Sequence, residues 1–178
     1  MRTYGRCGES IQSLEISIPN DCSVRLSSRN IVVPPKLKIR QQFRNTPTAD
    51  AKSNKIRFVN PDSKKCCLVL VDDCVFGKEE QKCDYLLLVP INKENNSNYD
   101  EYYIELKTKR GVKKAIEQLL NTITLLGRKN NSTIREAYVV CRKVDKTAKT
   151  YIQRFRPIFS DSFNCFLDVV ENPEPKII

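Results

Sequence analysis

The sequence predicts a protein of the α/β or α+β class, built around a mixed β-sheet. Two apolar runs at 66–76 and 83–91 are joined by a short polar segment that contains a glycine, a pattern typical of an antiparallel hairpin. Further along, the spacing of apolar residues changes from that of a strand at 101–107 to that of a helix at 111–127, and returns to that of a strand at 137–141. A strand, a helix and a strand in this order form a right-handed crossover with parallel strands. The expected core is therefore an antiparallel hairpin followed by a β-α-β crossover, with flanking helices.

The N-terminal region, residues 1–60, is predicted to be rich in short strands. Polar and apolar residues alternate at 13–19 and at 36–43, as they do in strands with one buried face, and a polar loop follows at 44–54. This region is either a β-rich N-terminal extension or the first elements of the core. Residues 61–160 are expected to form the core itself.

Two charges interrupt the predicted strand at 101–107. Side chains alternate along a strand, so Ile104 and Leu106 point to one face while Glu105 and Lys107 leave on the other. An acid and a base beside each other on a half-buried face cost free energy unless they have partners or a task. This pair is therefore the first candidate for a functional site.

The helix that follows is the most regular element of the chain. Its apolar residues recur three and four positions apart, and Gly127 is a suitable C-terminal stop. A C-terminal tail is expected at 161–178. Its apolar patch should pack as a short helix, and two prolines after it should end the regular structure.

Composition places the chain among ordinary globular proteins. With 178 residues, 40% hydrophobic and 29% charged, it can bury one core. No apolar stretch reaches the roughly 18 residues needed to cross a bilayer, and the first residues lack the apolar segment of a secretory signal. We therefore expect a cytoplasmic protein that does not associate with membranes.

The eight cysteines are expected to be reduced thiols, because nothing in the sequence indicates export. A zinc site is the alternative, but the chain has no C-x-x-C pair and no histidine. Its four candidate ligands are Cys66, Cys67, Cys74 and Cys83.

The absence of histidine and the high net charge reduce the number of function classes to which the chain can belong. Without histidine, Ser-His-Asp and Cys-His hydrolases and two-histidine zinc hydrolases are excluded. The net charge of +10 and the basic clusters at 34–44, 107–114 and 141–156 favour a polyanionic partner, DNA or RNA, over a merely soluble basic protein.

A third charged residue, Asp84, begins the second hairpin strand. If that strand neighbours the one with Glu105, the two carboxylates approach each other and repel unless a divalent cation lies between them. Mg²⁺ suits two oxygen ligands of this kind, and Mn²⁺ can substitute. Lys107 would then orient the attacking water and stabilise the charge that develops at phosphorus.

An Asp on one strand, Glu-x-Lys on the next and an amphipathic helix after them resemble the PD-(D/E)xK nuclease superfamily, which has the restriction-endonuclease-like fold. The resemblance covers roughly residues 66–142, with Asp84 and Glu105-Leu106-Lys107 as the motif. It implies that Asp84 and Glu105 are metal ligands, that the Leu106 carbonyl completes the metal shell, and that Lys107 is catalytic. Gln118 stands in a helical region where some branches carry a glutamine that supports the site.

The sequence departs from the family pattern at three places. The acidic residue that many members carry on an early helix has only Glu9 and Glu15 as candidates. Cys83, and not proline, precedes Asp84. Thr122 stands four residues after Gln118, where exonuclease-like branches carry an aromatic residue. A RecB-like exonuclease is therefore not favoured.

Each of these residues has a plainer interpretation. Asp84 can cap a turn, Glu105 and Lys107 can form the solvated face of a strand, and Gln118 can be a surface residue. Four basic residues near the helix start either bind phosphates or solvate the entry to the helix. They are Lys109, Arg110, Lys113 and Lys114.

The function that these residues favour is a Mg²⁺-dependent nuclease that acts on DNA, and on RNA with lower preference, in prokaryotic defence, restriction or repair. The alternative is a catalytically inactive nucleic-acid-binding module or a subunit of a larger complex. In either case the N-terminal region is expected to dock a second copy of the chain or a partner protein.

Overall fold

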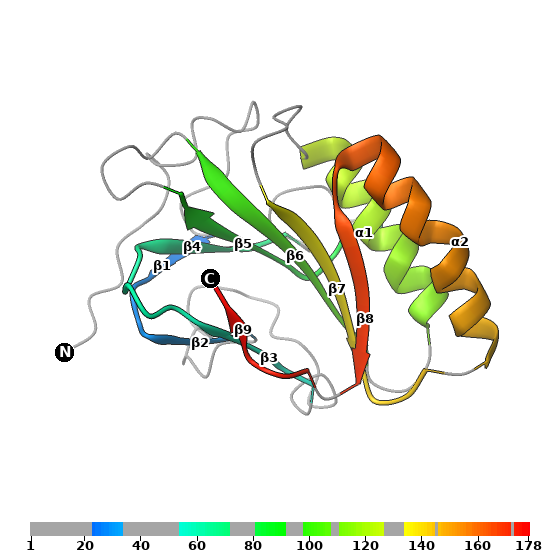
Figure 1. The fold of residues 1–178 in the computed structure, drawn as a ribbon, viewed down its shortest axis with the longest axis horizontal. Coiled ribbons are helices and arrows are strands. Elements are labelled where there is room, and N and C mark those ends of the chain that lie inside the picture. The colour runs from blue at the N-terminus through cyan, green and yellow to red at the C-terminus, as the bar shows by residue number, and fades with distance from the viewer. Residues whose placement is uncertain are drawn as a thin grey trace.

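The computed structural model describes residues 23–33, 54–71, 81–91, 98–107, 111–126, 134–144, 146–171 and 173–178. In these residues the chain forms three layers: a pair of helices, a six-stranded sheet and a three-stranded sheet (Figure 1).

The middle layer is a mixed sheet. Its strands, in spatial order, are β1 (Ser23–Leu26), β4 (Cys66–Leu70), β5 (Tyr85–Pro90), β6 (Tyr99–Lys107), β7 (Arg135–Cys141) and β8 (Phe166–Glu171). Neighbours are antiparallel from β1 to β6 and parallel from β6 to β8. The predicted hairpin (β4 and β5) and the predicted parallel crossover (β6 to β7) are confirmed.

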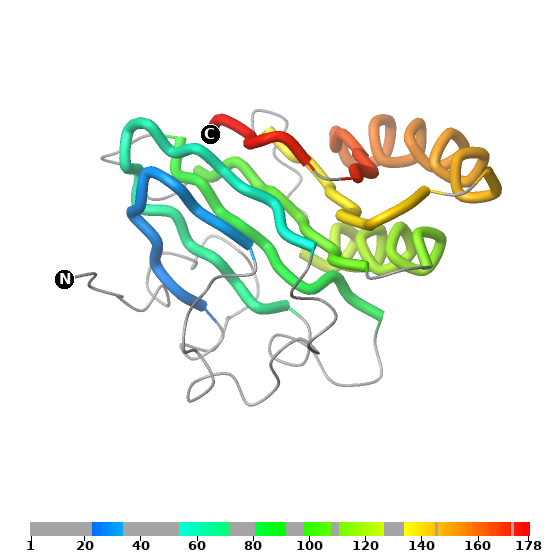
Figure 2. The backbone as a smooth tube through the Cα atoms, turned by 90° about the horizontal axis from the view of Figure 1, so that it is seen from below, coloured from blue at the N-terminus to red at the C-terminus, as the bar shows by residue number. Residues whose placement is uncertain are grey.

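The two faces of this sheet are covered differently. Helices α1 (Val112–Leu126) and α2 (Lys146–Phe163) pack on one face (Figure 1). A second sheet covers the other face (Figure 2), formed by β2 (Asn30–Val33), β3 (Ile56–Val59) and β9 (Lys176–Ile177). The described residues confirm a mixed α and β class, and none of their helices is long and apolar enough to cross a membrane.

The N-terminal region contributes strands to both sheets. β1 pairs with β4 at the edge of the large sheet, and β2 and β3 form most of the small one. The strands predicted at 13–19 and 36–43 lie outside the described residues.

The C-terminal region differs from the prediction of a short helix. Residues Phe166–Glu171 form β8, which pairs parallel with β7. A short apolar run cannot be assigned to helix or strand by periodicity alone. Here the run forms a strand because the edge of β7 offers it backbone hydrogen-bond partners. Before it, α2 runs for 18 residues although it contains Pro157.

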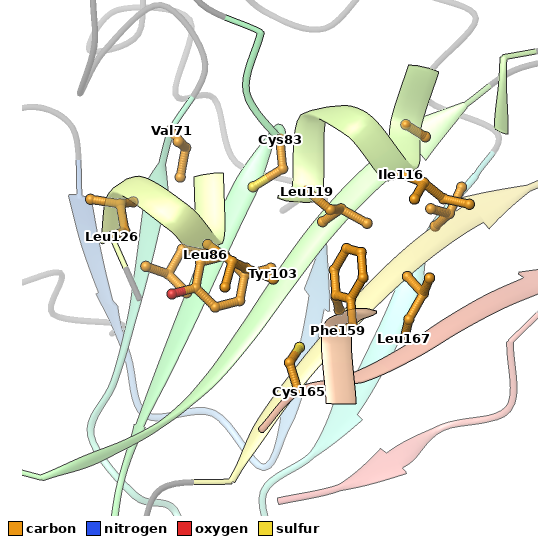
Figure 3. Packing of buried hydrophobic residues seen from close by; sticks show 14 of the residues in the cluster. Val71, Cys83, Leu86, Tyr103, Ile116, Leu119, Leu126, Phe159, Cys165 and Leu167 are labelled. Atoms are coloured by element: carbon orange, nitrogen blue, oxygen red, sulfur yellow. The ribbon is translucent and has the colours of Figure 1, made fainter. Parts of the chain in front are cut away.

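The main core lies between the helices and the large sheet (Figure 3). α1 buries one stripe there, which includes Ile116 and Leu119, and α2 contributes Phe159. Strand alternation sets which residues of β6 join this core: Tyr103 points toward the helices, whereas Ile104 and Leu106 pack toward the second sheet. Glu105 and Lys107 share the face of Tyr103, so the predicted separation of this strand into two faces is confirmed.

Candidate active site

Asp84 and Glu105 lie opposite each other on neighbouring strands. β5 pairs antiparallel with β6 so that Tyr85 faces Ile104, and Asp84, one residue earlier, comes opposite Glu105. The Asp84 N–H donates to Glu105 Oε2 at 3.0 Å, and the Leu106 N–H donates to Asp84 Oδ2 at 2.8 Å. Each carboxylate thus holds the backbone of the other strand, and the structure brings the two acidic candidates together.

Glu105 is the more buried of the two, with 1% of its surface exposed. Burial raises the pKa of its carboxyl group, and the negative charge of Asp84 raises it further; the ion pair with Lys107 opposes both, and the pKa rises to about 8. A buried acid with a specific charged partner and a displaced pKa is typical of functional sites, although structural ion pairs can produce it too.

Lys107 closes the site at the end of β6. Its ammonium group forms an ion pair with Glu105 Oε1 and donates to Gln118 Oε1 at 2.7 Å. The other end of the Gln118 amide donates through Nε2 to the Lys82 carbonyl, also at 2.7 Å. Gln118 therefore links the lysine to the start of β5, and its predicted nearness to the site is a feature of the structure.

Two residues that sequence reasoning did not select hold this arrangement in place. Thr122 is fully buried; its Oγ1 accepts the Cys83 N–H at 2.9 Å and donates to the Gln118 carbonyl at 2.8 Å. Asn54, buried at the start of the second sheet, donates through Nδ2 to the Lys107 carbonyl. The sequence does indicate a buried hydrogen bond at Thr122, because a threonine in the apolar stripe of a helix needs a partner. Nothing in the local sequence indicates the role of Asn54.

Two of the four basic candidates lie in the part of the chain that the structure describes. Lys113 and Lys114 lie exposed in the first turn of α1, whereas Lys109 and Arg110 lie outside the described residues.

The cysteines of the zinc alternative do not converge on one site in the described part of the chain. Cys66 packs toward the second sheet, while Cys67 and Cys83 pack toward the helices; Cys74 is not described. Burial raises the pKa of the Cys83 thiol well above its ordinary value, which disfavours the thiolate that zinc requires.

The donor set at Asp84 and Glu105 fits a hard cation. Within the described ranges no group of three or more His, Cys, Asp or Glu side chains could hold a metal ion. Mg²⁺, however, is bound through one or two carboxylates and keeps several waters. In an extended strand the N–H and C=O of one residue point to the same side, so the Leu106 carbonyl also faces Asp84. A cation would offset the repulsion that raises the pKa of Glu105.

A scan against models of known protein families and searches of curated proteins and of solved structures found nothing that matches the chain. Functional inference for this protein therefore depends on the residues and geometry described above.

Proposed function

We propose that the chain has the restriction-endonuclease-like fold and is a Mg²⁺-dependent nuclease that hydrolyses phosphodiester bonds of DNA. The observation that carries the proposal is the convergence of Asp84, Glu105 and Lys107 on one face of two adjacent strands, with Gln118 hydrogen-bonded to the lysine. These are the residues through which the sequence resembles the PD-(D/E)xK pattern, and their convergence supports the proposal.

Several neighbouring contacts suit these residues for catalysis. Asp84 and Glu105 would hold the cation together with the Leu106 carbonyl, and their backbone hydrogen bonds fix both carboxylates before substrate arrives. A bound Mg²⁺ ion supplies positive charge that activates water and stabilises the charge developing at phosphorus. When it binds, the Glu105 carboxyl group must lose the proton that its raised pKa favours.

Lys107 is placed to act on the reacting groups directly. Its side chain is 21% exposed, so part of it is open to the solvent from which a phosphate would approach. The Gln118 oxygen and Glu105 restrict its position, which lowers the reorganisation needed during the reaction. It would orient the attacking water and stabilise the negative charge on the phosphoryl oxygens.

The test is cleavage of labelled single- and double-stranded DNA and RNA with Mg²⁺, Mn²⁺ or EDTA. We expect metal-dependent products with DNA, and a loss of about 100-fold or more in rate for Lys107→Ala. Lys176→Ala is the matched control, because Lys176 also pairs with a glutamate (Glu136 Oε1 at 2.8 Å) but lies in β9 of the second sheet. Melting curves of both variants separate loss of chemistry from loss of folding.

Undiminished cleavage by Lys107→Ala contradicts the assignment of this residue. Salt-sensitive DNA binding without cleavage by the unmodified protein under any metal condition contradicts the nuclease proposal, and favours a binding module that uses the same fold.

A further inference from the structure

A shallow groove lies along the exposed face of α2, and its lining contains none of the candidate-site residues. It has a volume of about 500 Å³ and is lined by Lys146, Thr147, Thr150, Tyr151 and Arg154. Residues three to four positions apart share one face of a helix, so these side chains form a continuous stripe. We call it the α2 groove.

The charge of the α2 groove is positive along its length. Lys146 and Arg154 are exposed at its two ends, and the exposed Arg142 and Lys143 precede the helix. The first turn of α2 carries no acidic side chain. Asp145, which directly precedes it in the sequence, lies outside the described residues.

Two acidic groups on neighbouring elements are already engaged in hydrogen bonds. Glu117 of α1 accepts the hydroxyl of Tyr151 at 2.9 Å, and Glu171 accepts the backbone N–H of Val144 at 2.5 Å. Both lie on elements packed beside α2, and neither projects from the groove stripe itself.

An aromatic ring and two hydroxyl groups complete the lining. The ring of Tyr151 stacks on Phe155 with centroids 4.4 Å apart, and the Lys113 ammonium lies 5.4 Å from its centroid. The hydroxyl groups of Thr147 and Thr150 line the same groove. The two faces of the Tyr151 ring are therefore occupied, and the cations and hydroxyl groups remain as the groups with which proteins bind the phosphates and sugars of a nucleic acid.

The position of the groove connects it with the candidate active site. β6 and β7 are parallel, and Lys107 lies directly beside Cys141 in the register, so both strands end at one edge of the sheet. Both helices begin shortly after these strand ends and lie side by side (Figure 1). Lys113, in the first turn of α1, follows β6 closely in the chain and reaches the ring of Tyr151 in the groove.

We propose that the α2 groove binds the phosphodiester backbone of the DNA whose cleavage is proposed above, beside the segment that enters the site. The inference rests on the proposed function for the identity of the DNA as substrate. Lys146 and Arg154 are eight positions apart, which on a helix is about 12 Å. A span of this length can meet at least two successive phosphates of one DNA strand.

The experiment measures binding of the full chain to a fluorescein-labelled DNA duplex by fluorescence anisotropy in EDTA, over a series of salt concentrations. The double variant Lys146→Ala/Arg154→Ala removes the two exposed ends of the groove. We expect it to weaken binding about tenfold at about 0.1 M salt. We also expect the slope of log K against log salt to become shallower by about 1.8, because each lost phosphate contact contributes about 0.9.

Arg29→Ala/Lys65→Ala is the matched control. It removes one arginine and one lysine, both exposed, so the change in net charge is the same. Lys65 directly precedes β4, whereas Asp84 pairs with Val71 just after β4, so this control lies at the opposite end of that strand from the candidate site. We expect the wild-type salt slope from it.

Three results would overturn the inference: a groove variant with wild-type affinity and slope, equal losses in the groove and control variants, or no DNA binding by the unmodified protein. Binding to vesicles of anionic lipid or to an RNA duplex, with DNA unbound, also overturns it. Cleavage of the same duplex in Mg²⁺ separates the two proposals. Groove-dependent binding without cleavage supports the groove and contradicts the nuclease proposal. Cleavage that the groove variant leaves unchanged at subsaturating DNA contradicts only the groove.

Discussion

Replacing Glu105 by glutamine is expected to stabilise the protein at alkaline pH while abolishing the proposed activity. Glutamine keeps the shape of the side chain and can still accept the Asp84 N–H that Glu105 accepts at 3.0 Å. What it removes is a carboxyl group that is 1% exposed and faces a second carboxylate. In the absence of a cation, ionising that group works against folding.

The magnitude follows from the pKa. Burial and Asp84 raise the pKa of Glu105 from its ordinary 4.5 to about 8. Between these values the folded protein keeps a proton that the unfolded chain has lost, so the free energy of unfolding falls as pH rises. The slope is about 1.4 kcal/mol per pH unit, and the total over this window is about 5 kcal/mol. This total is an upper bound for the gain in the variant, because Lys107 loses its ion pair there.

The assay is urea unfolding in EDTA at several pH values between about 5 and 9, with stability obtained by linear extrapolation. The wild-type protein should lose stability across this range, and Glu105→Gln should lose much less, so that the variant is the more stable protein at the upper end. Glu171→Gln makes the same chemical change at an exposed position and should keep the wild-type profile. An identical pH profile for Glu105→Gln and the wild type would refute the inference that folding raises the pKa of Glu105.

Two further predictions concern the cation and the support of the site. Saturating Mg²⁺, at about 100 times its dissociation constant, should raise the melting temperature by about 5–10 °C, and Asp84→Asn/Glu105→Gln should abolish this shift in differential scanning fluorimetry. Thr122→Val should destabilise the protein by about 1–3 kcal/mol in urea unfolding, because it leaves the Cys83 N–H buried without its acceptor. Thr124→Val, which removes an exposed hydroxyl with the same bond to its own helix, should cost much less; equal losses would contradict the role assigned to Thr122.

Features that depend on local periodicity could be predicted from the sequence. The alternation along β6 placed Ile104 and Leu106 on the face opposite Glu105 and Lys107, and the helical spacing after it defined α1. The nearness of Asp84 to Glu105 needed one more assumption, that the two strands are neighbours. That assumption holds because a short hairpin and a polar loop favour antiparallel pairing of consecutive strands.

Features that depend on distant pairing could not be predicted. Asn54 reaches the Lys107 carbonyl across 53 positions of sequence, and no short pattern encodes such a contact. α2 was obscured because Pro157 and many basic residues weaken its helical pattern, and only Ala148, Ile152 and Phe159 are buried along it. β8 becomes a strand because β7 offers it a partner. In each case the deciding interaction lies outside the segment itself.

The distribution of charge indicates that the proposed DNA binding and the proposed cleavage depend on different residues. Inside the site, Asp84 and Glu105 are balanced by Lys107, so the site itself contributes little to the net charge of +10. The α2 groove, by contrast, carries its cations on the exposed face of a helix whose apolar residues already anchor it to the sheet. The parallel pairing of β6 and β7 brings these two regions to one edge of the sheet without making either depend on the other for folding. Glu105→Gln should therefore still bind DNA with the wild-type salt slope. The groove variant should still cleave at the wild-type rate once DNA is saturating, and a groove variant that remained slow at saturation would show that the two regions act as one.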